Sequence, residues 1–258
     1  MSSIAALRVS IFLVLTLALL PIYLLGLLFD HLFGQRIVLL KIKKLWSRAV
    51  LRIVGIEKEI KGSKCKSNIF VSNHISWLDI LALNSTLDVI FIAKKEVRSW
   101  PGLGFLAVLG QTIFIERKSL SALTQKLALE KCLKKGQSVF FFPEGTSTDG
   151  SIVKQFKSSL FEVCYGEWFK ENNLGSVQPV TIIYKSPIES DPGFYSFWRE
   201  EDTIFDNIKK ILKKVSHGNV RLVFHKPIKF NQYVDRKHLS VACYKAVNNG
   251  LANSERSF

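Results

Sequence analysis

The stretch IFVSNHISWLDI, from Ile69 to Ile80, changes character near its centre. Its first four residues, Ile69 to Ser72, have the apolar and β-branched character of a buried strand. Ser76 is followed three residues later by Asp79, which fits a capping box: the hydroxyl accepts from a backbone N–H of the first turn, and the carboxylate reaches back. The stretch therefore predicts a strand that runs into a helix opening near Ser76.

The alternation of strand and helix continues after Gly55, which indicates an α/β domain with a mostly parallel sheet of about seven strands flanked by helices. The expected strands are Ile56 to Ile60, Ile69 to Ser72, Val89 to Ala93, Thr112 to Ile115, Ser138 to Phe142, Gln178 to Tyr184 and Val220 to Phe224. The expected helices, besides the one near Ser76, cover Leu103 to Leu109, Ser119 to Gly136, Ser158 to Lys170, Thr203 to Lys214 and Lys237 to Leu251. No repeat or linker divides the region, so residues 55–258 are expected to be one domain.

Polar side chains gather at the ends of three of these strands. The three groups are Asn73, His74 and Asp79; Glu116 and Arg117; and Glu144, Gly145 and Thr146. Ligands of open α/β sheets bind in the crevice beyond the carboxyl ends of the strands. In a parallel sheet the three groups meet on one side, so we expect the functional site there.

His74 is the candidate general base of this site. A carboxylate in the first turn of the following helix, Asp79, can fix the tautomer of the ring while the other ring nitrogen takes a proton from a substrate hydroxyl. No G-x-S-x-G elbow is present, and nothing marks Ser76 as an attacking group. We therefore expect direct attack by a substrate hydroxyl, without a covalent enzyme intermediate.

Each of these residues also has a purely structural interpretation. His74 could be an incidental neighbour of a helix cap, and Arg117 a solvated charge at a strand end. Glu144 and Asn73 could be turn residues, Asn73 stabilising the strand exit. Residue chemistry alone leaves these interpretations open.

The first 54 residues predict a membrane-associated module. Ile11 to Phe29 is an uncharged apolar run that, as a helix, extends about 28 Å, close to the hydrocarbon thickness of a bilayer. The run is long for a signal peptide, and no A-x-A-like cleavage site follows it. Pro21 and Gly26 are compatible with a kinked, tilted or re-entrant insertion as well as with a span.

The next segment, Arg36 to Gly55, predicts a basic amphipathic helix. Its apolar and basic residues fall on different faces, with Val38, Ile42, Leu45 and Ala49 on one and Lys41, Lys44, Arg48 and Arg52 largely on another. Such a helix can lie on an anionic leaflet, although a soluble helix with a charged face has the same pattern. The positive-inside rule then places the following domain at the cytoplasmic face of the inner or plasma membrane.

Lysine and arginine number 36 against 21 acidic residues, a formal net charge of +15. This excess indicates a polyanionic partner: a nucleic acid, an anionic membrane, or a phosphorylated or CoA-like substrate. The basic residues are dispersed, no nucleic-acid-binding motif appears, and a bilayer segment would hold the protein away from most nucleic acids. We therefore expect no nucleic-acid partner.

The cysteines and histidines do not have the spacing of a metal site. Cys65, Cys132, Cys164 and Cys243 form no C-x-x-C pair, and the five histidines include no H-E-x-x-H pattern. We expect no bound metal, no disulfide framework and a reducing environment.

Taken together, four short blocks resemble those of the membrane-associated glycerolipid acyltransferases, the family of 1-acylglycerol-3-phosphate acyltransferase. The N-H-x-x-x-x-D block is Asn73, His74 and Asp79, and GQTIFIER, ending at Arg117, approximates the second block. The third, F-P-E-G-T, is Phe142 to Thr146, and the fourth is VQPV, Val177 to Val180. The blocks stand in the family's order behind an apolar amino terminus, and the resemblance covers the chain after Gly55.

The resemblance implies an O-acyltransferase that moves an acyl group from acyl-CoA or acyl-carrier protein to a lysolipid hydroxyl and needs no cofactor. His74 is implied as the base and Asp79 as its orienter. Arg117 is implied to bind the acceptor phosphate, and Glu144, Gly145 and Thr146 to position the acceptor. The family's usual acceptor, 1-acyl-sn-glycerol-3-phosphate, is the first expectation, with phosphatidic acid as product.

The third block departs from the family in one position. Many members continue it with arginine, whereas this chain has Ser147, which cannot grip a phosphate bidentately. Phosphate binding then relies more on Arg117 and Lys157. SWLDI and EGTSTDG also resemble lyso-ornithine lipid acyltransferases, whose acceptor carries no glycerol phosphate, and this is the alternative. A membrane-tethered protein that binds anionic lipid is the non-enzyme alternative.

Overall fold

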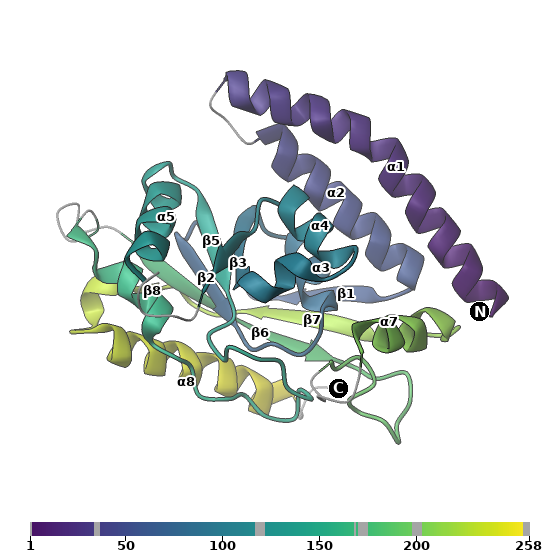
Figure 1. Cartoon of the computed structure of the whole chain (residues 1–258). Coiled ribbons are helices and arrows are strands. Elements are labelled where there is room, and N and C mark those ends of the chain that lie inside the picture. Colours follow the sequence, from purple (N-terminus) through teal and green to yellow (C-terminus); the bar gives the residue numbers. More distant parts are fainter. Residues whose placement is uncertain are drawn as a thin grey trace.

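The computed structural model describes residues 2–33, 37–116, 122–167, 169, 175–197 and 203–254. Within these ranges, eight strands form one central sheet (Figure 1). The strands are β1 (Glu57–Lys61), β2 (Ile69–Ser72), β3 (Val89–Lys94), β4 (Ile113–Ile115), β5 (Ser138–Phe141), β6 (Ser176–Tyr184), β7 (Asn219–Phe224) and β8 (Ile228–Lys229). Their order is β1-β7-β6-β2-β5-β3-β4, and β8 pairs with β6. All seven expected strands are confirmed, and β8, only two residues long, was not expected.

Most of the sheet is parallel, as expected. The strands β6, β2, β5, β3 and β4 run in one direction. β7 is antiparallel to β6, and β1 is parallel to β7. The start of β7 lies beside the end of β6, with Tyr184 paired to Val220, because the connection through α7 returns the chain to the end of the sheet that it left.

Helices cover both faces of the sheet. They are α1 (Ser3–Leu32), α2 (Ile37–Val54), α3 (Leu78–Asn84), α4 (Leu103–Leu109), α5 (Ala122–Lys134), α7 (Ile204–Lys213), α8 (Arg236–Ser254) and the 3₁₀ helices η1 (Lys95–Ser99), η3 (Ser159–Tyr165) and η4 (Phe230–Gln232). One core joins Phe70 and Phe140 to α2, α3 and α7, and the other joins Ile69 and Phe141 to α5, η3 and α8. The alternation along each strand therefore produces two buried faces.

The expected helix from Ser158 to Lys170 is wrong in type over Ser159–Tyr165, whereas the described Glu167 and Phe169 near its end are helical. Ser159–Tyr165 is a 3₁₀ helix, and Gly166 after it is extended, with φ −65° and ψ 153°. Phe161 and Cys164, three residues apart, are both buried, which suits three residues per turn. Two residues near the end of the expected helix, Trp168 and Lys170, lie outside the described residues.

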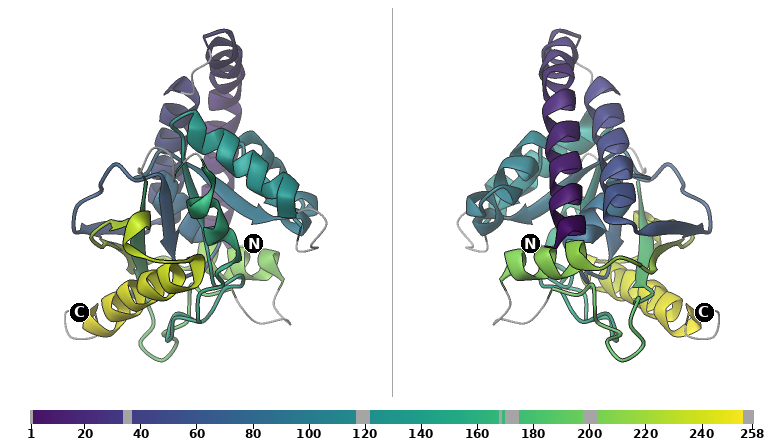
Figure 2. Two further views of the ribbon diagram at one scale, coloured as in Figure 1. Left: turned by 90° about the vertical axis from the view of Figure 1, so that its left-hand side faces the viewer. Right: turned by 90° about the vertical axis from the view of Figure 1, so that its right-hand side faces the viewer.

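The two amino-terminal helices form an antiparallel hairpin that projects from the sheet, opposite α8 (Figures 1 and 2). The Asp30 carboxylate accepts from Leu39 N at 2.9 Å and so caps the start of α2. The helices approach closely at Gly26, where a Cβ would lie 2.7 Å from Val38 Cγ1. The division between residues 54 and 55 stays a prediction, and Val50, Leu51 and Val54 of α2 belong to the core.

Much of the surface of α1 away from the hairpin is apolar and exposed. Its most apolar 18-residue window has a mean hydropathy of 2.7 and is 11% buried. The large exposed apolar residues of α1 are Leu7, Ile11, Leu13, Val14, Leu17, Ile22, Leu24, Leu25, Leu28, Phe29 and Leu32. By length and composition the helix could cross a bilayer.

The start of α1 is nevertheless tied to the α/β domain. Arg8 Nη1 donates to the backbone oxygens of Leu212 at 3.0 Å and Lys214 at 2.6 Å. These carbonyls end α7, where a cation interacts favourably with the helix dipole. The one arginine in this apolar helix therefore docks α1 on the domain.

Candidate active site

The histidine and aspartate of the N-H-x-x-x-x-D block form a hydrogen-bonded pair beyond the carboxyl end of β2. His74 Nδ1 lies 2.7 Å from Asp79 Oδ2, and the side chain of Asp79 is fully buried. A carboxylate can only accept, so Nδ1 carries a proton, and in the neutral ring the lone pair is then on Nε2. The His74 side chain is 25% exposed. Its geometry is that of a general base with an orienting acid.

The aspartate also closes the turn between β2 and α3. The same Oδ2 accepts from Ile75 N at 2.8 Å and Ser76 N at 3.0 Å. The cap and the pair therefore coexist, because one oxygen takes all three donors. Ser76 is fully buried, and its Oγ accepts from Leu78 N at 3.4 Å, a position that suits a cap and not a nucleophile.

The second oxygen of Asp79 has a partner from the other half of the chain. The Tyr184 hydroxyl, at the end of β6, donates to Asp79 Oδ1 at 2.8 Å. Sequence reasoning missed this residue, since the two positions are 105 residues apart. The fourth block, Val177 to Val180, stands just before it on the same strand and was the available signal.

Asn73 has the structural function that the sequence left open. Its Nδ2 donates to the Ile182 carbonyl at 2.9 Å, and its Oδ1 accepts from Ile182 N at 2.8 Å. The side chain thereby continues the pairing of β2 with β6 for one step beyond Ser72. This amide fixes the point at which the chain leaves the sheet toward His74.

The Phe142-to-Thr146 loop packs directly against the pair. The rings of Phe142 and His74 are stacked, with centroids 4.0 Å apart. Glu144 is buried; its Oε2 accepts from His74 N and its Oε1 from Lys154 N, each at 2.8 Å. Burial raises the pKa of Glu144 to about 7, against the lowering effect of those two backbone donors. Glu144 thus joins the two loops and does not face the solvent as a turn residue.

The neighbouring positions of that loop are more open. Gly145 has φ +71°, and a Cβ there would lie 3.0 Å from Lys157 Nζ, so an ammonium group covers this glycine. Thr146 is exposed. These residues, like Lys157, stand near the His74 loop and keep their expected substrate-binding roles as predictions.

Ser147, at the position where many relatives have arginine, is already engaged. Its hydroxyl donates to the backbone oxygen of Phe197, and Phe197 N donates to Ile75 O at 2.9 Å. The serine therefore ties the segment around Phe197 to the loops that hold Glu144 and His74. It cannot contribute the charge or the fork of donors that arginine brings.

Arg117, the expected phosphate ligand, lies outside the described residues, so its binding role stays a prediction. The preceding Glu116 directly follows β4 and forms an ion pair with Lys95. Among the described residues, no group of three or more His, Cys, Asp and Glu side chains could hold a metal ion. The expectation that no metal is bound stays a prediction as well.

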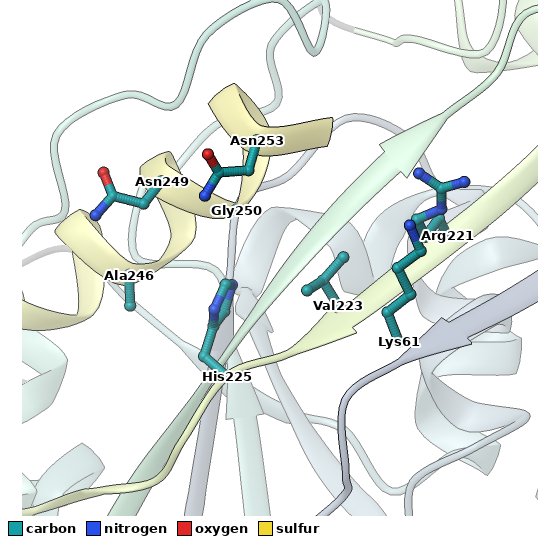
Figure 3. A pocket seen from close by; sticks show the side chains of 8 residues that line it. All are labelled: Lys61, Arg221, Val223, His225, Ala246, Asn249, Gly250 and Asn253. Carbon is teal, nitrogen blue, oxygen red and sulfur yellow. The ribbon is translucent and has the colours of Figure 1, made fainter. Parts of the chain in front are cut away.

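A separate groove of about 540 Å³ lies between β1, β7 and α8 (Figure 3). It is lined by Lys61, Arg221, Val223, His225, Ala246, Asn249, Gly250 and Asn253, which include neither member of the His74–Asp79 pair. Arg221 is paired with Glu59 at 2.7 Å, and His225 Nε2 lies 2.8 Å from Thr181 Oγ1. Arg221 and His225 are thus already bonded within the sheet, and the candidate site stays at His74.

Comparison with known proteins agrees with the fold and the motif order. The profile of the Acyltransferase family matches residues 55–205. A lyso-ornithine lipid O-acyltransferase of Rhodobacter capsulatus is 36% identical over 210 residues, covering 81% of this chain and 75% of that protein. A 1-acyl-sn-glycerol-3-phosphate acyltransferase of Neisseria gonorrhoeae is 39% identical over 111 residues, covering 42% of this chain and 44% of that protein.

Among solved structures, the crystal structure of the 1-acyl-sn-glycerophosphate acyltransferase PlsC from Thermotoga maritima superposes with a TM-score of 0.65. The match covers 97% of this chain and 99% of that chain, at 21% sequence identity. It confirms the α/β architecture behind an amino-terminal helical segment.

Proposed function

This chain belongs to the Acyltransferase family, and from that premise we propose that it transfers an acyl group from a thioester donor to the free hydroxyl of lyso-ornithine lipid. The observation that carries acyl transfer is the 2.7 Å contact between His74 Nδ1 and Asp79 Oδ2. In the neutral ring this contact leaves Nε2 unprotonated and partly exposed, as a base acting on an alcohol requires.

The proposed reaction proceeds in two steps. The acceptor hydroxyl gives its proton to His74 Nε2 while its oxygen attacks the thioester carbonyl carbon. The tetrahedral intermediate then collapses, the C–S bond breaks, and the His74 imidazolium protonates the leaving thiolate. Acyl-CoA and acyl-carrier protein both supply such a thioester, and neither route needs a cofactor.

Asp79 acts on the ring and not on the substrate. Its carboxylate holds Nδ1–H and stabilises the imidazolium that forms during attack. Because two backbone donors and Tyr184 also hold the carboxylate, the ring direction is set before substrate binds. Such preorganisation keeps Nε2 aimed at one place.

Two observations support the ornithine acceptor. The Rhodobacter capsulatus relative carries that activity in its name and matches most of both chains. In addition, the Ser147 hydroxyl is bonded to the Phe197 carbonyl, so this position offers no cation for a phosphate. The family's usual acceptor is a phosphate monoester, whereas an ornithine head group carries a carboxylate and an ammonium.

1-Acyl-sn-glycerol-3-phosphate is the second candidate acceptor. Lys157 favours it, because its ammonium lies over Gly145 in the loop beside His74. Arg117 stands in the block to which the family resemblance assigns phosphate binding. Two cations could hold a phosphate without the missing arginine.

One assay separates the two acceptors. Lyso-ornithine lipid and lysophosphatidic acid are offered separately to the same membrane preparation with acyl-CoA and with acyl-carrier-protein donors, and the products are counted. We expect kcat/KM for lyso-ornithine lipid to exceed that for lysophosphatidic acid with the better donor. Appreciable turnover of lysophosphatidic acid alone would overturn the proposed acceptor.

We also propose that the protein binds one leaflet, at the cytoplasmic face of the inner or plasma membrane. The Arg8 bonds hold the start of α1 on the same side as the α/β domain, and Asp30 holds its end beside α2. A helix held at both ends on one domain can immerse its apolar face without crossing. The basic residues of α2 favour an anionic, cytoplasmic surface.

The apolar surface extends from α1 to α4. Trp100, Phe105 and Val108 are 37%, 60% and 44% exposed. The two helices are joined where the Tyr23 hydroxyl donates to the Leu109 carbonyl. Trp100 also makes an edge contact with Phe197, which is bonded to the His74 loop. These contacts connect the apolar surface of α1 and α4 with the loop that holds His74.

The topology is tested with a cleavable tag on the amino terminus in vesicles of known orientation. We expect a protease to cut the tag from the same side on which it digests the α/β domain. Cleavage of the tag only from the opposite side shows that α1 spans the bilayer.

A further inference from the structure

The Asp79 carboxylate is held by four hydrogen bonds, and they are divided unequally between its oxygens. Oδ2 accepts from His74 Nδ1, Ile75 N and Ser76 N, at 2.7, 2.8 and 3.0 Å. Oδ1 accepts from the Tyr184 hydroxyl at 2.8 Å. The backbone donors belong to the same turn as His74, whereas Tyr184 comes from β6 across the sheet.

We infer that Tyr184 is a positioning residue for the proposed acyl transfer: its hydroxyl fixes the plane of the Asp79 carboxylate and sets how strongly Oδ2 attracts the His74 proton. A buried carboxylate that loses a donor is a stronger base, and its attraction for an imidazolium rises. The inference rests on the proposed function, because it concerns the proton that His74 takes from the acceptor.

The surroundings of Tyr184 keep it a donor. Burial, together with the neighbouring Asp79 carboxylate, holds the pKa of Tyr184 well above its usual range. The phenol therefore stays protonated through the range in which a histidine titrates, and Asp79 can only accept from it.

The ring of Tyr184 is also fixed from behind. It packs on Tyr195, with centroids 5.2 Å apart. Tyr195 is 1% exposed, and its hydroxyl accepts from Gly218 N at 2.9 Å and contacts His217 Nδ1 at 3.1 Å. The two tyrosine rings thus pack against each other, and only the Tyr184 hydroxyl is bonded to Asp79.

Other ionisable groups that face the pair come from the loop after β5. Glu144 bonds His74 N and feels the Asp79 charge, Lys154 lies beside Glu144, and Lys157 covers Gly145. On the Tyr184 side the neighbours are Tyr195 and, behind it, His217. The pKa of Glu144 is also near neutral. The test therefore measures the titration of the His74 ring directly, in addition to the pH dependence of the rate.

The test compares Tyr184→Phe with Tyr195→Phe in the full chain. Each variant removes one hydroxyl from this pair of packed tyrosines, but only the Tyr184 hydroxyl touches Asp79. The readouts are kcat and KM for lyso-ornithine lipid and lysophosphatidic acid across pH, and the midpoint of the His74 ring titration by NMR. The thermal midpoint of each variant controls for folding.

For Tyr184→Phe we expect kcat to fall about 10- to 100-fold with KM nearly unchanged, as for a small misplacement of a catalytic group. The acid limb of the rate profile and the His74 titration should both move to higher pH, because the less satisfied carboxylate holds the imidazolium proton more tightly. Tyr195→Phe should leave both midpoints at the wild-type pH even if it unfolds at a lower temperature.

A fluorinated tyrosine at position 184 keeps the shape and sharpens the test if the phenylalanine variant folds poorly. Its hydroxyl is a stronger donor, so the His74 midpoint should move to lower pH, opposite to Tyr184→Phe. Midpoints that stay at the wild-type value in both variants overturn the inference. A wild-type enzyme that acylates neither lysolipid contradicts the proposed function instead, while the NMR midpoints still decide the inference.

Discussion

At the scale of residues, a single carboxylate oxygen of Asp79 serves both the helix start and the ring of His74, the proposed general base. Asp79 Oδ2 accepts from two backbone N–H groups and from His74 Nδ1. The helix cap and the His74–Asp79 pair are therefore formed by the same turn, which explains why the sequence pattern was compatible with both.

Asp79→Asn tests this dual use. An amide offers one oxygen in place of two and brings its own N–H donors toward the ring, so the Nδ1–H tautomer loses its acceptor. We expect kcat to fall about 10²- to 10⁴-fold, the usual contribution of general-base catalysis. The measurement is steady-state acyl transfer with circular dichroism as the fold control, and a loss below threefold contradicts the orienting role.

Gly145→Ala tests the close approach of Lys157, and the chain offers a matched control in Gly136→Ala. Both glycines have φ +71°, so both alanines carry the backbone strain of about 1 kcal/mol or more. Only at position 145 would the new Cβ meet a side chain, Lys157 Nζ at 3.0 Å. We expect equal losses of stability within the uncertainty but a higher KM for Gly145→Ala alone; equal KM values would argue against acceptor binding at this loop.

Glu144 gives the stability of the protein a distinctive pH dependence. Its folded-state pKa of about 7 lies above the value of about 4.3 expected unfolded, so the folded protein binds more protons between these values. The free energy of unfolding contributed by this group therefore decreases as pH rises through that window, by about 3 kcal/mol. Denaturant unfolding at pH 4.5 and 7.5 should show this slope in wild type and lose it in Glu144→Gln; an identical slope in both proteins assigns the effect to other groups.

The His74–Asp79 pair was predictable because its members stand five residues apart across a strand-to-helix turn. The hydrogen bonds of Asn73 to Ile182 and of Tyr184 to Asp79 were not, because they join positions more than 100 residues apart. Sequence spacing reports local neighbours, and only the sheet order places β6 beside β2.

At the scale of elements, apolar runs located seven of the eight described strands to within two residues. The direction of β7 depends on which end of the sheet the connection through α7 reaches, and no local pattern records that. The 3₁₀ form of Ser159–Tyr165 likewise depends on packing against the sheet and on Gly166.

The docking of α1 on α7 is an interaction between elements that one side chain dominates. Arg8→Met keeps the length of the side chain and removes its bonds to Leu212 and Lys214. We expect a loss of about 2 kcal/mol, as for buried hydrogen bonds of a charged donor. Thermal unfolding in detergent measures it, with the exposed Arg52→Met as control. Equal midpoints for the two variants would show that Arg8 does not anchor the helix.

At the scale of the whole molecule, the exposed apolar faces of α1 and α4 and the net charge of +15 fit an anionic leaflet. Val108→Ser, on α4, should lower the affinity for anionic vesicles, measured by co-sedimentation, about three- to tenfold. This factor corresponds to the loss of roughly 1 kcal/mol of apolar burial. Val234→Ser is the control, because Val234 is more exposed, at 91%, and precedes α8 on the far side of the sheet. A loss as large for Val234→Ser contradicts the assigned surface.

The proposed reaction depends on one claim, that His74 removes the proton from a lysolipid hydroxyl during acyl transfer. The most direct measurement is a single-turnover reaction with a radiolabelled acyl donor and excess lyso-ornithine lipid, comparing wild type with His74→Gln. We predict that the label appears in the acylated lipid with wild type and that the rate falls at least about 100-fold in a folded His74→Gln protein. Transfer by that variant at the wild-type rate would contradict the claim.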